Sequence, residues 1–179
     1  SDSVAAGTCP QEEVITRTWT GTDDCGNASS CDQIVTVIDD TAPVITCPAD
    51  TTVNCEDDRT SAATGEATAT DNCDNDVTIT ESDSVAAGTC PQEEVITRTW
   101  TGTDDCGNAS SCDQVVAVID DEAPVITCPT DTTVNCEEDR TSAATGKATA
   151  TDNCDSEIDI VESDSVAAGT CPQEEVITR

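Results

Sequence analysis

Five residue types are missing from this chain of 179 residues: histidine, phenylalanine, tyrosine, methionine and leucine. Tryptophan occurs twice, as Trp19 and Trp100, so the chain can bury only thin hydrophobic cores. Histidine is the most frequent general base and a frequent metal ligand, and lysine occurs once, as Lys147. No nucleophile lies beside a plausible base in the sequence, and we therefore expect the protein not to be an enzyme.

Basic residues are also scarce. Six Lys and Arg stand against 38 Asp and Glu, which gives a net charge of −32. This excess of negative charge excludes nucleic acid as a natural partner. The sequence contains neither a signal peptide nor an apolar run of membrane-spanning length, as we expect of an excerpt from a longer secreted chain.

The sequence repeats itself with a period of 81 residues. Residues 82–162 match residues 1–81 at all but eleven positions, and a third copy begins at Ser163. A period of this length exceeds the ~20–50 residues of solenoid units and approaches the size of a small domain. We interpret the chain as part of a tandem array of domains.

Cysteine compensates for the missing core. Each repeat holds six cysteines, which recur at the same six positions of the next repeat. Small domains with few apolar residues are commonly stabilised by disulfides, which persist in oxidising compartments. Zinc is the alternative, but histidine is absent, no pair of CxxC motifs occurs, and the neighbouring residues are acidic. The cysteines therefore predict an extracellular, disulfide-stapled protein.

Short segments rich in β-branched residues alternate with Gly, Pro, Asn and Asp, which is typical of an all-β sandwich. Differences between the repeats indicate which side faces inward: Thr36 is replaced by Ala117, while Val116 and Val118 keep apolar counterparts. The predicted strand segments are VITCP, TTVNC, EATATD, VTIT, EEVITRTWTGTD and QIVTVID.

The segment EEVITRTWTGTD supplies the main core residue. Trp100 shares one face of the strand with Ile96 and Gly102, so we expect it to be buried rather than exposed for ligand stacking. Arg98 has the same parity, and we expect it to reach an edge carboxylate or to bury its stem beside the Trp.

The domain boundary is predicted in the linker IDDTAP at residues 38–43, which recurs as IDDEAP at residues 119–124. Residues 41–121 then form one complete repeat. Residues 1–40 are the C-terminal half of a preceding repeat, and residues 122–179 are the N-terminal part of a following one.

Three strings of this chain resemble a known family: TAPVITCPADTTVNC, GEATATDNCD and ITRTWTGTDDCGNASSCDQVVAVID. They are similar to HYR-type immunoglobulin-like repeats, above all to the cysteine-rich repeats of cell-surface and gliding-motility adhesins of Bacteroidota, of the SprB type. The resemblance covers the whole repeat. It implies an immunoglobulin-like sandwich, export to the bacterial outer surface, and service in an adhesin stalk or filament.

Six cysteines per repeat permit about fifteen pairings, and spacing alone does not choose among them. Within residues 41–121, pairs adjacent in the sequence are sterically the simplest. This scheme leaves Cys9 to a partner outside the sequence, with a free thiol as the alternative. The expected pairs are Cys25 with Cys31, Cys47 with Cys55, Cys73 with Cys90, Cys106 with Cys112, Cys128 with Cys136, and Cys154 with Cys171.

Acidic and amide residues concentrate in three segments of each repeat. In an immunoglobulin-like sandwich the incoming linker, the loop after the second strand and the loop before the last strand lie at one pole. Carboxylates gathered there repel one another unless a cation lies among them, and Ca²⁺ takes about 6 to 8 oxygen ligands. We therefore expect Ca²⁺, in preference to Mg²⁺, to stiffen each junction between repeats. Turn formation and a solubilising negative surface are the alternative.

The predicted ligands form one group per junction. The complete repeat supplies Asp39, Asp40, Asp71, Asn72, Asp74, Asp104, Asp105 and Asn108. The following junction supplies Asp120, Asp121, Asp152, Asn153 and Asp155, and Asp23, Asp24 and Asn27 belong to the preceding one.

Several Asp-Ser and Asp-Thr steps resemble the O-glycosylation motif of Bacteroidota, with ordinary turns as the alternative. This resemblance implies modification at Ser3, Thr41, Thr51, Ser84, Thr132 and Ser165.

We expect a structural stalk or filament segment of an extracellular bacterial adhesin, which projects a distal binding element and whose partners are neighbouring repeats. One alternative is direct binding of surface polysaccharide by the repeats, which an exposed Trp would favour. Another is lateral self-assembly with other chains into a fibre, which contacts at the variable residues Glu66 and Lys147 would favour.

Overall fold

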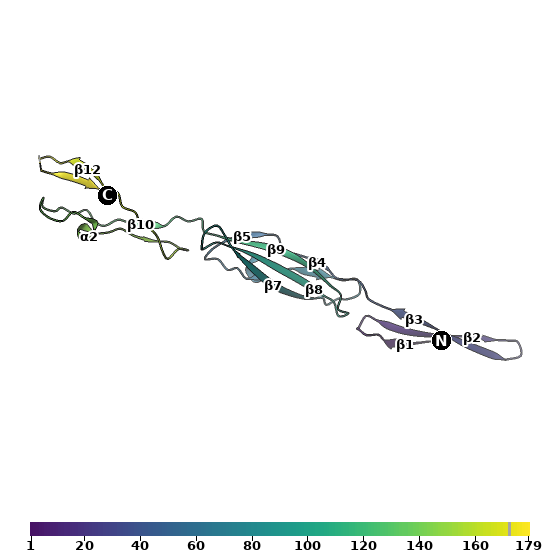
Figure 1. The fold of residues 1–179 in the computed structure, drawn as a ribbon. Helices are drawn as coiled ribbons and strands as arrows, with labels where there is room; N and C mark the ends of the chain where they lie inside the picture. The colour runs from purple at the N-terminus through teal and green to yellow at the C-terminus, as the bar shows by residue number, and fades with distance from the viewer. Residues whose placement is uncertain (172) are drawn as a thin grey trace. The chain divides into compact units, whose positions relative to one another are not determined.

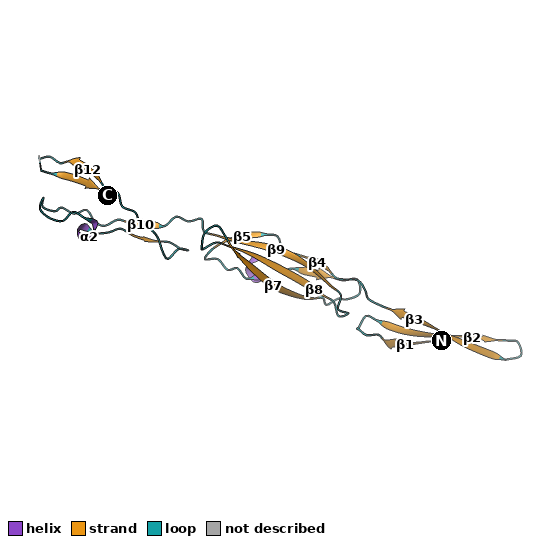
Figure 2. Cartoon of the chain, viewed as in Figure 1, coloured by secondary structure: helices purple, strands orange, loops and turns teal. Residues whose placement is uncertain are grey.

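The computed structural model describes residues 1–171 and 173–179. Antiparallel strands dominate it (Figures 1 and 2), and the chain divides into two compact units, residues 1–53 with 57–118 and residues 54–56 with 119–179. The described helices, α1 (Ser61–Thr64) and α2 (Ser142–Thr145), are single turns, and neither could cross a membrane. The strands are β1 (Asp2–Ala6), β2 (Glu13–Thr22), β3 (Ala28–Val37), β4 (Val44–Thr46), β5 (Thr51–Asn54), β6 (Thr68–Thr70), β7 (Thr78–Ala87), β8 (Glu94–Thr103), β9 (Ala109–Ile119), β10 (Val125–Thr127), β11 (Thr149–Thr151), β12 (Ser165–Ala168) and β13 (Glu175–Thr178).

The complete repeat is built from a four-stranded sheet, in the order β5-β9-β8-β7, and a two-stranded sheet of β4 and β6. Gly102 of β8 marks where the two sheets approach each other. A Cβ at this position would lie 3.5 Å from the Cβ of Ala69 on β6 and 3.6 Å from the Cδ1 of Ile45 on β4. This arrangement confirms the predicted all-β, immunoglobulin-like fold class.

The core follows the alternation of the sequence. On β8, Ile96 and Trp100 are 5% and 4% exposed, and on β9, Val116 and Val118 are 0% and 1% exposed. Every second residue of both strands faces inward, which confirms the predicted facing. The burial of Trp100 removes it from any role in ligand stacking in the complete repeat.

The half-repeat at the N-terminus forms a separate sheet in the order β1-β2-β3. Trp19 pairs with Cys31 across β2 and β3, just as Trp100 pairs with Cys112 across β8 and β9. Trp19 is nevertheless 57% exposed. The same strand sequence therefore buries its Trp only in the repeat where strands β4 and β6 are also present.

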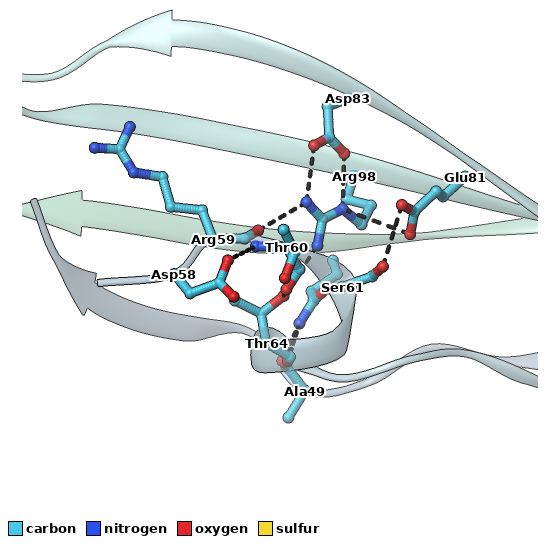
Figure 3. Close-up of polar contacts among 10 residues, drawn as sticks. Ala49, Asp58, Arg59, Thr60, Ser61, Thr64, Glu81, Asp83 and Arg98 are labelled. Carbon is cyan, nitrogen blue, oxygen red and sulfur yellow. Dashed lines mark hydrogen bonds and ion pairs between the residues drawn. The ribbon is translucent and has the colours of Figure 1, made fainter. Parts of the chain in front are cut away.

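A buried guanidinium group holds α1 and the residue Arg59 before it against the four-stranded sheet (Figure 3). Arg98 of β8 is 3% exposed, and its Nε and Nη2 each donate to one carboxylate oxygen of Asp83 on β7 at 2.8 Å. Nη1 donates to the hydroxyl of Thr64, and Nη2 to the carbonyl oxygen of Arg59, both at 2.9 Å. The structure confirms the ion pair expected between Arg98 and a carboxylate at the sheet edge, and the whole side chain is buried.

The same group of contacts recurs in the second unit, whose strands form two sheets, β10 with β11 and β12 with β13. Arg179 donates to both carboxylate oxygens of Asp164, to the hydroxyl of Thr145 at 3.1 Å, and to the carbonyl oxygen of Arg140 at 3.2 Å. We call this set of contacts the arginine cage: an arginine bound by an aspartate, a threonine hydroxyl and the carbonyl oxygen of a second arginine. Its recurrence shows that it is a property of the repeat.

Three disulfides join Cys9 to Cys106, Cys47 to Cys112, and Cys55 to Cys154, with Cα–Cα distances of 5.1, 6.0 and 5.9 Å. Cys47 follows β4 and Cys112 lies on β9, so this bridge ties the two sheets of the complete repeat together. The remaining cysteines have no disulfide partner within the described residues: Cys25, Cys31, Cys73, Cys90, Cys128, Cys136 and Cys171.

The expected pairing of sequence-adjacent cysteines is wrong. Cys73 and Cys90 flank β7, whose ten residues span about 33 Å, whereas a disulfide needs Cα atoms within about 7 Å. The repeat relation carries this reason over to Cys154 and Cys171.

The other expected pairs fail for a related reason. Cys106 lies in the turn before β9, and Cys112 lies three residues, or about 10 Å, inside that strand. Cys47 follows β4 of one sheet, and Cys55 follows β5 of the other. Cys25 with Cys31 and Cys128 with Cys136 are the equivalents of these two pairs in the flanking repeats.

Trypsin digestion without reduction tests this connectivity, because the chain has six Lys and Arg residues. We expect fragments 1–17, 18–59, 99–140 and 148–179 to migrate as one cross-linked product, and fragment 60–98 to carry two free thiols. Mass spectrometry before and after reduction measures both. If sequence-adjacent cysteines were paired, every disulfide would lie within one fragment, and no two fragments would be joined.

Removing the carboxylate from the arginine cage should destabilise the complete repeat. We expect Asp83→Asn to lower the free energy of unfolding by about 2 kcal/mol, because a buried guanidinium loses its charged acceptor, and solvent access to Asp83 limits the loss. Urea denaturation at pH 7 measures the change. The matched control is Asp2→Asn, since Asp2 pairs with Arg17 in the same register but on an exposed face, and no change is expected there.

The pH dependence of this difference has a defined sign. The hydrogen bond from Arg98 lowers the pKa of Asp83 below its ordinary value of 3.8. A lowered folded-state pKa stabilises the protein above the pKa of the unfolded chain, and that contribution is lost as the pH falls through the folded value. The difference between the wild type and Asp83→Asn should hold down to about pH 5 and vanish at about pH 2. An undiminished difference at the lower pH contradicts this assignment.

Candidate metal centre

The linker and two loops of the complete repeat meet around a group of aspartates. Asp39 of the linker, Asp74 of the loop before β7 and Asp104 of the loop before β9 are 6%, 5% and 6% exposed. The side-chain amide of Asn108 donates to the backbone carbonyl oxygen of Asp39 at 3.1 Å, which fastens the linker to the loop before β9. The structure therefore brings together the three segments that were predicted to converge.

Two of the buried carboxylates serve the loops themselves. Asp74 accepts the backbone N–H of Asp76 with one oxygen and that of Asp105 with the other, both at 2.8 Å, so it joins the two loops. Asp104 accepts the backbone N–H and the side-chain amide of Asn108 at 2.7 and 2.9 Å. Burial alone would raise the pKa of Asp104, but these hydrogen bonds outweigh it, and the pKa is lowered.

Asp39 and Asp71 differ from Asp74 and Asp104 because only one of their two carboxylate oxygens accepts a hydrogen bond from the described residues. Oδ1 of Asp39 accepts the N–H of Thr41 at 3.3 Å, and Oδ1 of Asp71 accepts the N–H groups of Cys73 and Asp74 at 2.8 and 3.0 Å. Oδ2 of each is buried and has no hydrogen-bond partner among the described residues. A buried carboxylate oxygen without a partner is costly, and a cation would satisfy both oxygens.

The third member of this group is a cysteine. A carboxylate oxygen of Asp39, one of Asp71 and the Sγ of Cys73 lie within 4.8 Å of one another. Desolvation and the charges of Asp39, Asp71 and Asp104 raise the pKa of the Cys73 thiol.

An equivalent group lies in the second unit, where Asp120, Asp152 and Cys154 have ligand atoms within 4.8 Å of one another. Asp152 accepts the N–H groups of Cys154 and Asp155, both at 2.9 Å, as Asp71 does in the first group. Cys154 is bonded to Cys55, so its sulfur offers no thiolate. The feature that both groups share is a pair of carboxylates, which favours a hard cation over zinc.

The other predicted ligands lie outside these groups. Asp40, Asn72, Asp105, Asp121 and Asn153 are exposed, and Asp155 is half-buried. In the half-repeat, Asp23 accepts the backbone and side-chain N–H groups of Asn27, both at 2.8 Å. The loop that holds Asp23, Asp24 and Asn27 is exposed, and among the described residues it forms no such group of ligand atoms. Of the predicted glycosylation residues, Thr51 is half-buried. The others are exposed: Ser3, Thr41, Ser84, Thr132 and Ser165.

Sequence reasoning missed that several of the acids are consumed as acceptors in their own turns. The spacing Asp-x-x-x-Asn of residues 104–108 could have signalled this, because Asp side chains commonly accept backbone N–H groups a few residues later. It also missed that the Ser110 hydroxyl donates to the carbonyl oxygen of Pro43, a second tie between linker and repeat.

Comparison with known proteins adds one finding. No curated protein shows significant similarity to the chain. A family model matches most of the complete repeat, a stretch that holds six of the cysteines and both loops of the first aspartate group. Residues 43–118 are similar to the family described as HYR-like domain with 4 cysteines, and this match supports the HYR type that the sequence motifs implied.

Proposed function

We propose that this chain is a structural segment of an extracellular bacterial adhesin, in which tandem immunoglobulin-like repeats form a stalk or filament that projects a distal binding element. Disulfides and a divalent cation at each linker make the segment rigid. The HYR-like match supports an adhesion-type repeat, and the burial of Trp100 argues against direct polysaccharide binding by an aromatic surface.

The observation that carries this proposal is the burial of the linker residue Asp39 in the repeat that follows it. A flexible linker would leave this residue in solvent, yet it is 6% exposed. Asn108 and Ser110, both next to the start of β9, bond to the carbonyl oxygens of Asp39 and Pro43. A linker fastened at both positions transmits the orientation of one repeat to the next, as a stalk requires.

A cation at this linker would complete the attachment. Two carboxylate charges about 5 Å apart repel by about 3 kcal/mol at an effective dielectric constant of about 20, so binding of a cation removes a repulsion as well as adding contacts. Ca²⁺ suits the site because it accepts carboxylate oxygens in irregular geometry and fills its remaining positions with water. With two carboxylates per group, the expected dissociation constant is about 10⁻⁴ to 10⁻³ M, the range of extracellular modules.

Calorimetric titration of the whole chain with CaCl₂ tests the cation. We expect binding in this range, and we expect Asp39→Asn to abolish it at the first group, because an amide removes the charge and one of the two free oxygens. Glu66→Gln is the matched control: it removes one exposed carboxylate from the same repeat, at a position where the next repeat has Lys147, and it should leave binding unchanged.

Small-angle scattering of the same samples links binding to function. The proposal expects the chain to become more flexible after EGTA, and the Asp39→Asn variant to resemble the EGTA-treated wild type in the presence of Ca²⁺. Absence of heat on titration, or equal loss of binding in Glu66→Gln, rejects the cation and leaves the aspartates as turn residues of a negative surface.

A further inference from the structure

The sequence separations of the disulfides divide them into two kinds. Cys47 and Cys112 are 65 residues apart, less than the repeat period of 81, and both lie within the complete repeat. Cys9 and Cys106 are 97 residues apart, and Cys55 and Cys154 are 99 apart, so each of these bonds joins one repeat to the next. We call these two the inter-repeat disulfides.

The same separations account for all the unpaired cysteines. Each of the thirteen cysteines occupies the same repeat position as a member of one of the three bonds. When the separations of 65, 97 and 99 are applied to the seven unpaired cysteines, every partner falls outside residues 1–179. The three observed bonds are the ones that have both ends inside this range.

The unpaired Cys25 and Cys90 share local structure with their paired counterparts, Cys106 and Cys9. Cys25 and Cys106 each precede a glycine with positive φ, 87° and 91°, in the turn before the last strand. The carbonyl oxygens of Cys90 and Cys9 each accept the N–H of the glutamate three residues later at 3.1 Å. The turns around these two unpaired cysteines are therefore already in the conformation found in the bonded state.

Cys73 and Cys154, which lie in the two aspartate groups, also have the same local hydrogen bond. The N–H of the unpaired Cys73 donates to Asp71 at 2.8 Å, and the N–H of the bonded Cys154 donates to Asp152 at 2.9 Å. At the three repeat positions of Cys25, Cys73 and Cys90, local geometry thus does not distinguish the unpaired cysteine from its paired counterpart. What differs is whether the partner at the observed separation falls within residues 1–179.

We infer that, in an array of these repeats, every repeat is bonded to the next by two disulfides in addition to its internal one, and no cysteine of an interior repeat remains a thiol. Each bond forms when two thiols release two protons and two electrons to a disulfide oxidant, such as oxidised glutathione, which is reduced to two thiols. The partner of the unpaired cysteines is thus another repeat of this sequence, in the register of the bonds already present.

This cross-linking has a consequence for an exposed filament. The loop closed by Cys9 and Cys106 overlaps the next loop of its kind, which starts at Cys90, by 16 residues. Every interior peptide bond of the array is therefore spanned by at least one inter-repeat disulfide. A single backbone cut would leave the array in one piece, and tension could pass around each linker through covalent bonds. This mechanical role rests on the proposed stalk function. The disulfides themselves would form whether or not the array is a stalk and whether or not it binds a cation.

Counting thiols in chains of increasing length tests the inference. The chain of 179 residues, refolded in dilute solution with oxidised and reduced glutathione, should have seven thiols after denaturation and alkylation. Extension by one further repeat adds six cysteines and should leave the count at seven, because three more disulfides form. Fragment 60–98, which carries Cys73 and Cys90, should move from the free to the cross-linked fraction. In the extended chain, Cys90→Ser should release one additional thiol, located in the added repeat.

Two results would overturn the inference. If only the internal bond forms, each added repeat raises the thiol count by four. If sequence-adjacent cysteines pair, the chain of 179 residues has one thiol, and fragment 60–98 is never joined to another. Both outcomes are independent of Ca²⁺, so a failure of the cation proposal leaves this test unaffected.

Cleavage of the linker tests the consequence directly. A site for a specific protease, inserted between Asp121 and Glu122 of the whole chain, divides it into two fragments that Cys55 and Cys154 should hold together. We expect one product on a non-reducing gel and two after reduction. Cys154→Ser provides the control, in which cleavage alone should separate the fragments. Separation of the unsubstituted chain without reductant would contradict the bridging of the linker.

Discussion

The buried guanidinium of Arg98 is the interaction on which the complete repeat depends, because it connects parts that the thin core cannot connect. Asp83 holds it on the neighbouring strand, while Thr64 and the carbonyl of Arg59 bring the α1 segment onto the same face. An unpaired buried cation costs several kcal/mol, so its four hydrogen bonds offset a penalty as much as they add stability. The benefit is specificity, since only one arrangement of these three segments satisfies the fork. The recurrence of the cage at Arg179 shows that it belongs to the repeat and not to one position in the chain.

Covalent bonds supply the stability that the core lacks. Trp100 and a few valines and isoleucines are the main apolar contents of the complete repeat, and the bond between Cys47 and Cys112 ties its sheets together across them. In the chain-entropy account a loop of 65 residues contributes about 4 kcal/mol, comparable with the burial of two large side chains. Bonds that run from repeat to repeat extend the same principle along the array, because each repeat then restricts the unfolded states of its neighbour.

Local patterns in the sequence predicted the local features of the fold. The alternation along β8 and β9 predicted the burial of Trp100 and Val116, because side-chain facing depends on parity alone. Disulfide connectivity was not predictable in this way. The strand between Cys73 and Cys90 was expected to be short, and its real length of ten residues separates them. Bonds between repeats depend on contacts about a hundred residues apart, which no spacing rule within one repeat reveals.

The aspartates show the same division between local and non-local information. Their convergence at the linker followed from the fold, but their roles depend on individual hydrogen bonds. Asp74 and Asp104 use both oxygens on nearby N–H groups, whereas Asp39 and Asp71 each keep one buried oxygen that has no hydrogen-bond partner in the described part of the chain. In the second unit the corresponding cysteine, Cys154, is held in a disulfide, so oxidation leaves an oxygen-only site beside a covalent bridge. The chemistry of such a site favours a hard cation. In the proposed stalk, a cation there would lie at the same linker as the inter-repeat disulfide, where separate domains would otherwise bend.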